Sequence, residues 1–185
     1  FRVADEVVDA QETAPPPEQR TELERLRAAA LGERETDDDV LAAFAEMRDR
    51  HGIADEDIEV FIDAMAADID TNRYDRYEEL EAYMDGSAAA VGRMMTAVMD
   101  PGDPEAALPH ATKLGEAFQM TNFVRDVHED IVDRDRVYLP RETFERYGVS
   151  EEQLLNFEFD DDVAAAISHE TRRTERPYDE GLAGI

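Results

Sequence analysis

Two short segments of the sequence place polar side chains at a spacing that could bind cations. Near the start of the chain, Asp5 and Asp9 are four residues apart, and residues four apart share one face of a helix. A second polar row at helical spacing is formed by Gln119, Asn122, Asp126 and Asp130. Mg²⁺ is often held by one or two carboxylates together with substrate phosphates. Two such rows that face each other across a bundle could hold several magnesium ions that bridge to a diphosphate.

Spacing alone is weak evidence in so acidic a chain, because 47 of the 185 residues are Asp or Glu. Acidic pairs four residues apart also serve ordinary surface helices. The surroundings of the two segments strengthen the prediction. Asp5 and Asp9 are interleaved with apolar residues, and a cationic side chain, Arg2 or Arg125, stands near each segment. A diphosphate site needs such donors, so we interpret these acids as candidate metal ligands.

Other acidic runs and other chemistries have less support. The aspartate runs at residues 37–39 and 160–162 lack the apolar framing, and we interpret them as helix N-termini and solvated surface. The four histidines include no pair four residues apart, and the sequence contains no Gly-rich nucleotide loop and no nucleophile elbow. With no cysteine, disulfides and Cys metal sites are excluded.

Apolar residues recur at helical spacing along most of the chain, which predicts an all-α bundle. The expected helices span residues 1–13, 21–32, 37–50, 55–70, 77–99, 109–132, 141–147, 150–158 and 161–182. Within the fifth, the small residues 86–90 would let a neighbouring helix or a ligand approach closely. No alternating strand pattern of useful length is present. The length fits one domain over residues 1–185.

The charge is strongly one-sided, with a formal net charge of -28. This charge argues against nucleic acid as a partner, because phosphate contacts need basic patches. It also argues against tight electrostatic binding to anionic lipid. Lys113 is the only lysine among 19 basic residues, and an acidic, nearly lysine-free surface resembles that of proteins from salt-in halophiles. At molar salt the Debye length falls to about 3 Å, which screens the repulsion.

No apolar run approaches the roughly 20 residues of a membrane span. The chain opens at Phe1, already inside a helical pattern. We therefore expect a fragment, incomplete at both ends, of a halophilic archaeal protein, and a cytoplasmic location.

The residues of both polar rows belong to segments that resemble a known family. Residues 114–130 and 136–140, LGEAFQMTNFVRDVHED and RVYLP, closely resemble the second signature of the phytoene/squalene synthase family, LG-x-A-x-Q-x-TN-x-x-RD-x-x-ED followed by R-x-YLP. Residues 2–9 look like the end of the first signature. Residues 83–92 resemble the family's Tyr-x-x-x-x-A-x-x-VG helix, and the resemblance covers nearly the whole chain.

The resemblance implies the class I isoprenoid (terpenoid) synthase fold, an α-bundle around an apolar pocket. It implies that two prenyl diphosphates are joined head to head through a cyclopropyl diphosphate intermediate. The implied cofactor is Mg²⁺, with Mn²⁺ as an alternative, and the implied metal ligands are Asp5, Asp9, Asn122, Asp126 and Asp130. The implied substrate contacts are Arg2, Gln119, Asn122, Arg125, Arg136 and Tyr138. The four aspartates and Tyr83 would be catalytic.

Three functions stay open at this point. The Tyr138-Leu139-Pro140 ending and the lack of tryptophan favour the phytoene-forming branch of the family, which uses geranylgeranyl diphosphate and no NADPH. A squalene or dehydrosqualene synthase acting on farnesyl diphosphate is the alternative. A non-catalytic helical assembly or binding relative is a third, opposed by the presence of all four aspartates. The oily product suggests peripheral membrane contact, and the sequence leaves the oligomeric state open.

Overall fold

The computed structural model describes residues 1–9 and 14–184, so residues 10–13 of the first predicted helix lie outside the described part. The elements in chain order are α1 (Arg2–Asp9), α2 (Pro16–Ala30), α3 (Asp39–His51), α4 (Asp55–Ala67), α5 (Tyr77–Met84), the π-helix η1 (Asp85–Ala89), α6 (Ala90–Met99), α7 (Pro104–Arg125), α8 (Val127–Arg134), α9 (Arg141–Arg146), α10 (Glu151–Leu155) and α11 (Asp161–Leu182). Within the described residues, the only β-type pairing is an isolated bridge between Arg73 and Val137. The all-α prediction is confirmed.

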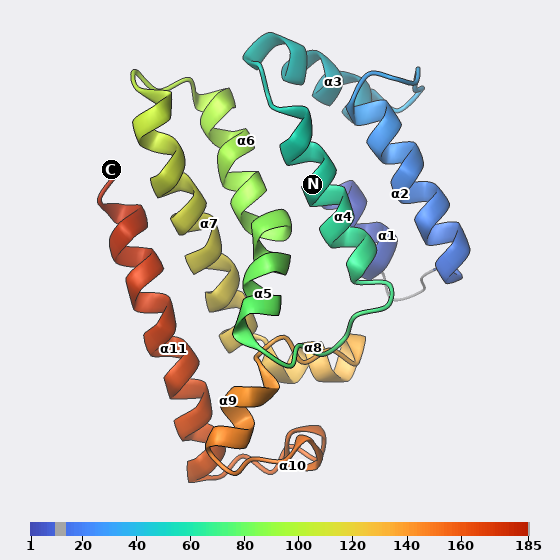
Figure 1. Ribbon diagram of the computed structural model, residues 1–185. Coiled ribbons are helices and arrows are strands. Elements are labelled where there is room, and N and C mark those ends of the chain that lie inside the picture. The colour runs from blue at the N-terminus through green and yellow to red at the C-terminus, as the bar shows by residue number, and fades with distance from the viewer. Residues whose placement is uncertain (10–13, 185) are drawn as a thin grey trace.

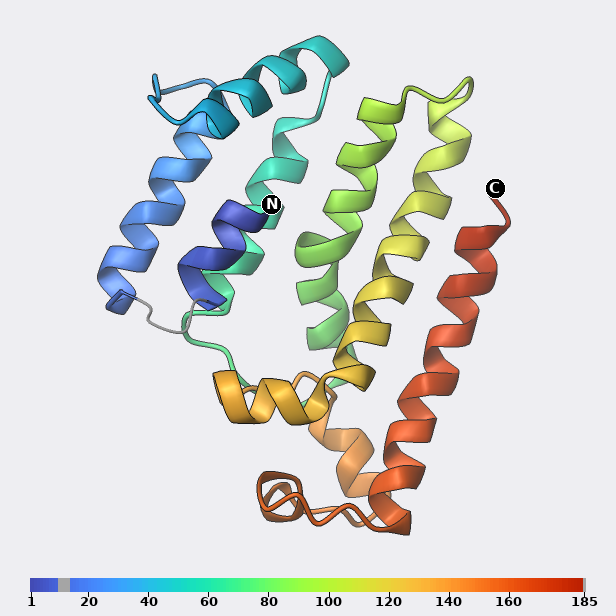
Figure 2. The ribbon, with the colours of Figure 1, turned by 180° about the vertical axis from the view of Figure 1, so that it is seen from behind.

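The helices form two groups that meet along α4, η1 and α6. In Figure 1, α7 lies beside α11 on one side and beside α6 on the other, in agreement with their extensive contacts. Helices α1, α2 and α4 form the second group, with α3 across one end (Figure 2). Helix α8 lies across the opposite end of the bundle, and α9 and α10 follow below it. This arrangement brings α8 close to the end of α1, although the two are far apart in sequence.

Small residues bring neighbouring helices into backbone contact. A Cβ built on Gly86 would lie 2.4 Å from the carbonyl oxygen of Val60 on α4. A Cβ on Gly115 would lie 2.6 Å from the carbonyl oxygen of Ala88. Only glycine fits at such distances, so the small segment 86–90 does admit neighbouring helices closely, as expected. The surrounding core is apolar and includes Leu80, Met84, Met94 and Met120.

Two predicted long helices are interrupted. The helix expected over residues 77–99 contains the five-residue π-helix η1 where it packs against α4. The helix expected over residues 109–132 breaks at Asp126, whose φ of −100° and ψ of 12° leave the helical region. Each boundary lies in the part of the molecule that forms the candidate site. Hydrophobic spacing did not indicate either one, because apolar residues continue through both.

Two helices also begin earlier than the sequence pattern predicted. Helix α2 begins at Pro16 rather than at residue 21, and α7 begins at Pro104 rather than at residue 109. Proline is tolerated in a first helical turn, where its missing N–H would have no partner in any case. The carboxylate of Asp103 accepts a hydrogen bond from the Ala106 N–H, which stabilises the start of α7. Both prolines therefore start helices.

The acidic runs outside the two rows cap helices, as predicted. The Asp38 carboxylate accepts hydrogen bonds from the N–H groups of Val40 and Leu41 at the start of α3. The Asp160 carboxylate does the same for α11, with Asp162 and Val163 as donors. Such caps satisfy N–H groups that have no partner inside the helix. These acids therefore stabilise the fold.

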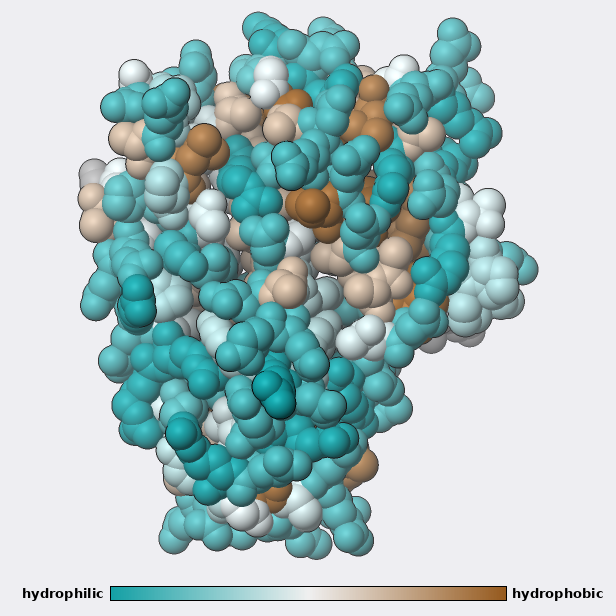
Figure 3. Space-filling view, viewed as in Figure 1, coloured by the Kyte–Doolittle hydropathy of each residue, from teal (hydrophilic) through white to brown (hydrophobic). Residues whose placement is uncertain are grey.

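Hydrophilic residues cover most of the molecular face in Figure 3, and the hydrophobic ones gather mainly in its upper half. Among the described residues, no helix combines the length and the apolar character needed to cross a membrane.

Candidate active site

A cavity of about 300 Å³ lies where α1, α4, η1 and α7 meet. Its acidic wall consists of Asp5 and Asp9 from α1 and Asp68, which directly follows α4. The other polar lining residues are Tyr83, Ser87, Gln119 and Tyr138, and the apolar ones are Phe1, Phe61, Met65 and Val91. Five residues singled out from sequence therefore share one cavity: Asp5, Asp9, Tyr83, Gln119 and Tyr138.

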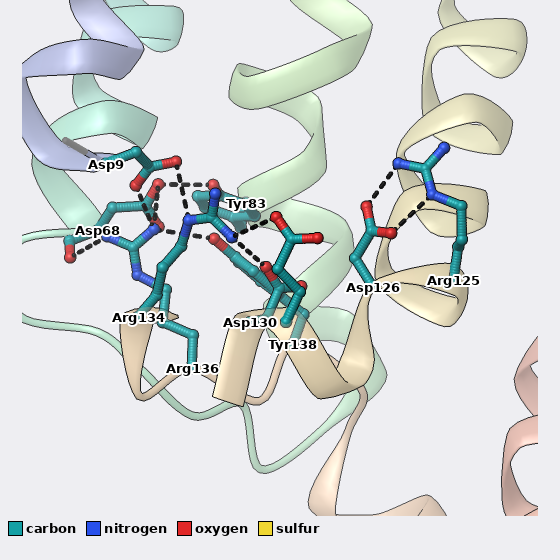
Figure 4. A network of polar contacts seen from close by, with 10 residues as sticks. Asp9, Asp68, Tyr83, Arg125, Asp126, Asp130, Arg134, Arg136 and Tyr138 are labelled. Carbon is teal, nitrogen blue, oxygen red and sulfur yellow. Dashed lines mark hydrogen bonds and ion pairs between the residues drawn. The ribbon is translucent and has the colours of Figure 1, made fainter. Parts of the chain in front are cut away.

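The second acidic row reaches the same end of the bundle through Asp130. This residue lies in the first turn of α8, and its side chain is 11% exposed. Arg134 Nη1 donates to Asp130 Oδ1 at 2.9 Å, while Arg134 Nε is 3.7 Å from Asp9 Oδ2. One guanidinium thus stands between an acid of α1 and an acid of α8 (Figure 4). The two rows meet across the bundle and do not lie on opposite surfaces.

Arg136 ties Asp9 to the cavity wall. Its Nη1 donates to Asp9 Oδ1 at 2.6 Å and to the Tyr138 hydroxyl at 3.1 Å. The backbone explains how this side chain returns to the cavity. Asp135 ends α8 in a left-handed conformation, with φ of 51°, and the Arg136 N–H then donates to the Asp130 carbonyl at 3.0 Å. The turn after α8 therefore positions the buried Arg136 beside the half-buried Arg134.

Four residues of the predicted set lie apart from this network. Arg2 is 90% exposed and pairs with Glu6. Arg125 donates to both carboxylate oxygens of Asp126, at 2.6 and 2.5 Å, and this pair stands to one side in Figure 4. The helix break at Asp126 sends α8 across the bundle, so Asp126 and Asp130 do not follow one straight helical row. Asn122 is half-buried on α7, and its backbone carbonyl oxygen accepts a hydrogen bond from the Asp126 N–H.

Burial sets the protonation behaviour of the acids. Desolvation raises the pKa of Asp130 to about 6, against the lowering effect of Arg134. Desolvation likewise raises the pKa of Asp68 to about 7, against Arg136, and raises the pKa of Asp5. The Arg125 hydrogen bond instead holds the pKa of Asp126 below its usual value. The buried carboxylates are thus costly to charge without a cation.

An aromatic cluster forms the wall beneath these acids. The rings of Phe123 and Tyr138 stack with centroids 4.1 Å apart, and Tyr83 lies 5.8 Å from Tyr138. Burial raises the pKa of both tyrosine hydroxyls far above neutrality. Both hydroxyls therefore stay protonated and neutral, and the ring faces offer a site that favours positive charge.

An apolar groove lies next to the polar cavity. A second cavity of about 370 Å³ follows α6 and α7 and shares Ser87, Val91 and Gln119 with the first. Its other lining residues are mainly apolar and include Met95, Met99, Leu114 and Phe118. A ligand with a charged head and a long apolar tail would match a polar cavity beside an apolar groove.

The donor set fits a hard divalent cation, because every acidic side chain at the cavity offers oxygen. In the described part of the chain, no three such side chains already form a metal-binding group. The two arginines partly neutralise the carboxylates instead. Cation binding would therefore require Asp9 or Asp130 to exchange its arginine for metal.

Two residues of the site were missed by the sequence analysis. Arg134 follows Asp130 by four residues, a helical spacing that could have indicated the ion pair. Asp68 directly follows the apolar stripe of α4, which includes Ile58, Phe61, Ile62 and Met65. Its position at the end of that stripe was the available signal for a buried acid.

Together, the fold and the site define a helical bundle with facing aspartates beside an apolar groove. The family model described as squalene/phytoene synthase matches residues 1–185. The chain belongs to the squalene/phytoene synthase family, as the signatures predicted.

The chain is similar to several curated phytoene synthases. It is 38% identical over 143 residues to a 15-cis-phytoene synthase of Synechocystis sp., covering 70% of this chain and 42% of the relative. It is 30% identical to a 15-cis-phytoene synthase of Synechococcus elongatus, covering 100% of this chain and 63% of the relative. The chain thus spans 42% and 63% of the length of these two relatives.

The fold matches that of solved relatives. A crystal structure of a dehydrosqualene synthase in complex with ligand superposes with a TM-score of 0.84 at 25% identity. The match covers 98% of this chain and 62% of that chain. The predicted isoprenoid-synthase type of helical bundle is therefore confirmed.

Proposed function

We propose that this chain carries the active site of a magnesium-dependent enzyme that joins two geranylgeranyl diphosphates head to head to form phytoene. Family membership supports head-to-head prenyl transfer, and the names of the similar curated proteins support phytoene as the product. The observation that carries the proposal is the position of Asp9 and Asp130 on either side of Arg134, next to a cavity that shares three lining residues with an apolar groove.

The charged end of the substrate would lie among the acids and arginines. Asp5, Asp9, Asp126 and Asp130, supported by Asn122, would hold Mg²⁺ or Mn²⁺, which neutralises charge on a departing diphosphate. Arg134 and Arg136, once released from the carboxylates, can donate charge-assisted hydrogen bonds to diphosphate oxygens. Gln119 lies at the junction of cavity and groove, where its amide can orient the ligand.

The apolar tail would follow the groove between α6 and α7. Loss of diphosphate leaves an allylic cation, which survives only where water is excluded. Tyr83 and Tyr138 line the cavity, and aromatic rings attract positive charge. Because these hydroxyls stay neutral, neither offers a phenolate that would trap the cation.

A squalene or dehydrosqualene synthase is the second candidate, favoured by the superposition on a dehydrosqualene synthase. The two are separated by incubating the full-length protein with Mg²⁺ and either geranylgeranyl or farnesyl diphosphate, with and without NADPH, in molar KCl. The proposal predicts phytoene from geranylgeranyl diphosphate without NADPH, identified by mass. Product formed from farnesyl diphosphate but not from geranylgeranyl diphosphate would favour the second candidate. No product from either substrate would contradict catalysis and favour a non-catalytic relative.

A further inference from the structure

Asp68 is a buried acid to which the proposed mechanism assigns no role. It directly follows α4, and its side chain is only 3% exposed. Its neighbour along the chain, Asp70, is 66% exposed and pairs with Arg20, as an ordinary surface acid would. A buried charge is costly unless it is paired and hydrogen-bonded, so the contacts of Asp68 indicate what it is for.

One carboxylate oxygen of Asp68 connects two walls of the cavity. The Tyr83 hydroxyl, from the end of α5, donates to Asp68 Oδ2 at 2.8 Å. Arg136 Nη1, from the turn after α8, lies 3.7 Å from the same oxygen, and Arg136 Nη2 donates to the Asp68 carbonyl at 3.0 Å. Arg136 in turn holds Asp9. Figure 4 shows the resulting chain of contacts from Tyr83 to Asp9.

The second carboxylate oxygen, Oδ1, is buried and has no hydrogen-bond partner among the described residues. Such an unsatisfied acceptor lowers stability. Ser87 Oγ, on the wall of the same cavity, is likewise buried and without a partner. Packing alone does not account for an acid held in this way, and two unsatisfied oxygens beside one cavity indicate a role tied to what the cavity binds.

We propose that Asp68 is a positioning residue that couples the two walls of the cavity. Its Oδ2 holds the Tyr83 hydroxyl in place at the wall. Its negative charge balances Arg136 and so limits how firmly Arg136 holds Asp9. The effect through Tyr83 on turnover rests on the proposed function, whereas the effect through Arg136 on cation binding does not.

Two substitutions separate these effects in the full-length protein. Asp68→Asn keeps an oxygen that can accept the Tyr83 hydrogen bond but removes the charge that balances Arg136. Asp68→Glu keeps the charge but shifts the carboxylate by one methylene, which breaks its alignment with Tyr83. Asp70→Asn is the matched control, because it makes the same chemical change at an exposed acid two residues away.

The first measurement is calorimetric binding of inorganic pyrophosphate at increasing Mg²⁺ concentration, at about pH 8.5, where Asp68, with a pKa of about 7, is charged. Without the Asp68 charge, Arg136 is balanced by Asp9 alone, so Mg²⁺ must compete harder for Asp9. Asp68→Asn should raise the Mg²⁺ concentration for half-maximal binding about tenfold, as is typical for a residue that orients a metal ligand. Asp68→Glu and Asp70→Asn should leave it unchanged.

The second measurement is turnover. Asp68→Glu should lower kcat by about 10- to 100-fold, with KM nearly unchanged, because a hydrogen bond to a charged group is lost. Tyr83→Phe should lower kcat similarly, and the double variant should be no worse than the worse single one, because both changes break the same contact.

The pattern of results decides the proposal. Asp68→Asn and Asp68→Glu could change the Mg²⁺ requirement for pyrophosphate binding and kcat to the same extent, with equal losses of melting temperature. Asp68 would then be only a structural residue, and the proposal would be wrong. The proposal would also be overturned if the losses of kcat in the two single variants multiplied in the Asp68→Glu/Tyr83→Phe double variant. Wild-type protein that binds no pyrophosphate in the presence of Mg²⁺ would overturn it too. A wild-type protein that binds pyrophosphate but makes no product would reject the proposed function, while the calorimetry still decides the coupling.

Discussion

Asp130 and Asp160 are the same residue type near helix N-termini, yet their surroundings differ completely. Asp160 is exposed and accepts two backbone N–H groups at the start of α11. Asp130 is buried, its pKa is raised to about 6, and its side-chain partner is Arg134, which also approaches Asp9. In a chain with 47 acids, candidate functional acids are thus distinguished by burial and shared arginines rather than by spacing.

The comparison also separates stability from function. A capping acid satisfies N–H groups and stabilises its helix. A buried acid with a raised pKa destabilises the fold when it is charged. Sites that retain such costly groups are commonly functional, which is why the cavity acids are the candidates for cation binding.

The largest expected effect is the loss of turnover when one of the proposed metal-binding acids is removed. Asp5→Ala or Asp126→Ala in the full-length protein should lower product formation at least about 1000-fold, because charge stabilisation of the leaving group is lost. The melting temperature should stay near the wild-type value. Product analysis and thermal unfolding measure the two quantities.

Asp160→Ala is the control for these variants, since it removes an acid that lies outside the cavity. Near-normal product formation by Asp5→Ala would show that the metal assignment to α1 is wrong. The same result for Asp126→Ala alone would remove only that residue from the set, consistent with its separate pairing to Arg125.

A second expected effect is stabilisation by ligand. Mg²⁺ with pyrophosphate at about 100 times the dissociation constant should stabilise the wild type by about 2.7 kcal/mol. Asp130→Asn should abolish this gain in stability, because the variant lacks the carboxylate that would release Arg134 and bind the metal. Differential scanning calorimetry with and without the ligands tests this, and equal stabilisation of both proteins would contradict it.

The third effect concerns pH. Folded Asp68 and Asp130 have pKa values of about 7 and about 6, above the unfolded value of about 4. The folded state therefore binds more protons between these values, and the free energy of unfolding should fall as pH rises from about 4 to about 7, by roughly 5 kcal/mol. Urea unfolding in molar KCl measures the slope.

Asp68→Asn provides the comparison for the pH effect, because it cannot titrate. Its slope should be clearly smaller than that of the wild type. Equal slopes would show that the pH dependence comes from the general surface charge and not from the cavity.

The smallest effect is expected at the caps. Asp160→Ala should lower the free energy of unfolding by about 1 kcal/mol, the usual value for a lost N-cap. Its product formation should equal that of the wild type, because Asp160 lines neither the groove nor the cavity as described, and its side chain hydrogen-bonds to its own helix start and to Gln153. A loss of activity without a loss of stability would break the distinction between the two kinds of acid.

The sequence predicted the helical class, the family and five of the residues that line the cavity, because those depend on periodicity and on specific signatures. It missed the break at Asp126, since the apolar pattern runs on through the break and gives no local signal. It also missed Arg134 and Asp68. Their importance comes from contacts with Asp9 and Tyr83 that exist only after the chain folds.

Two of the three predicted arginines, Arg2 and Arg125, show the opposite limitation. Each stands next to an acid cluster in sequence, but each pairs with a nearby acid on its own segment in the structure. The arginines that approach Asp9 are Arg134 and Arg136, whose placement depends on the turn at Asp135. Proximity in sequence was a poor guide to which cation meets which carboxylate.

The most direct test is anomalous diffraction from crystals of the full-length protein grown with Mn²⁺ and pyrophosphate. We predict manganese peaks between the aspartates of α1 and those at the α7–α8 break, with pyrophosphate bridging them inside the cavity that Asp9 and Tyr138 line. Manganese bound only on the outer surface, or at one row with the other still held by Arg134, would contradict the account.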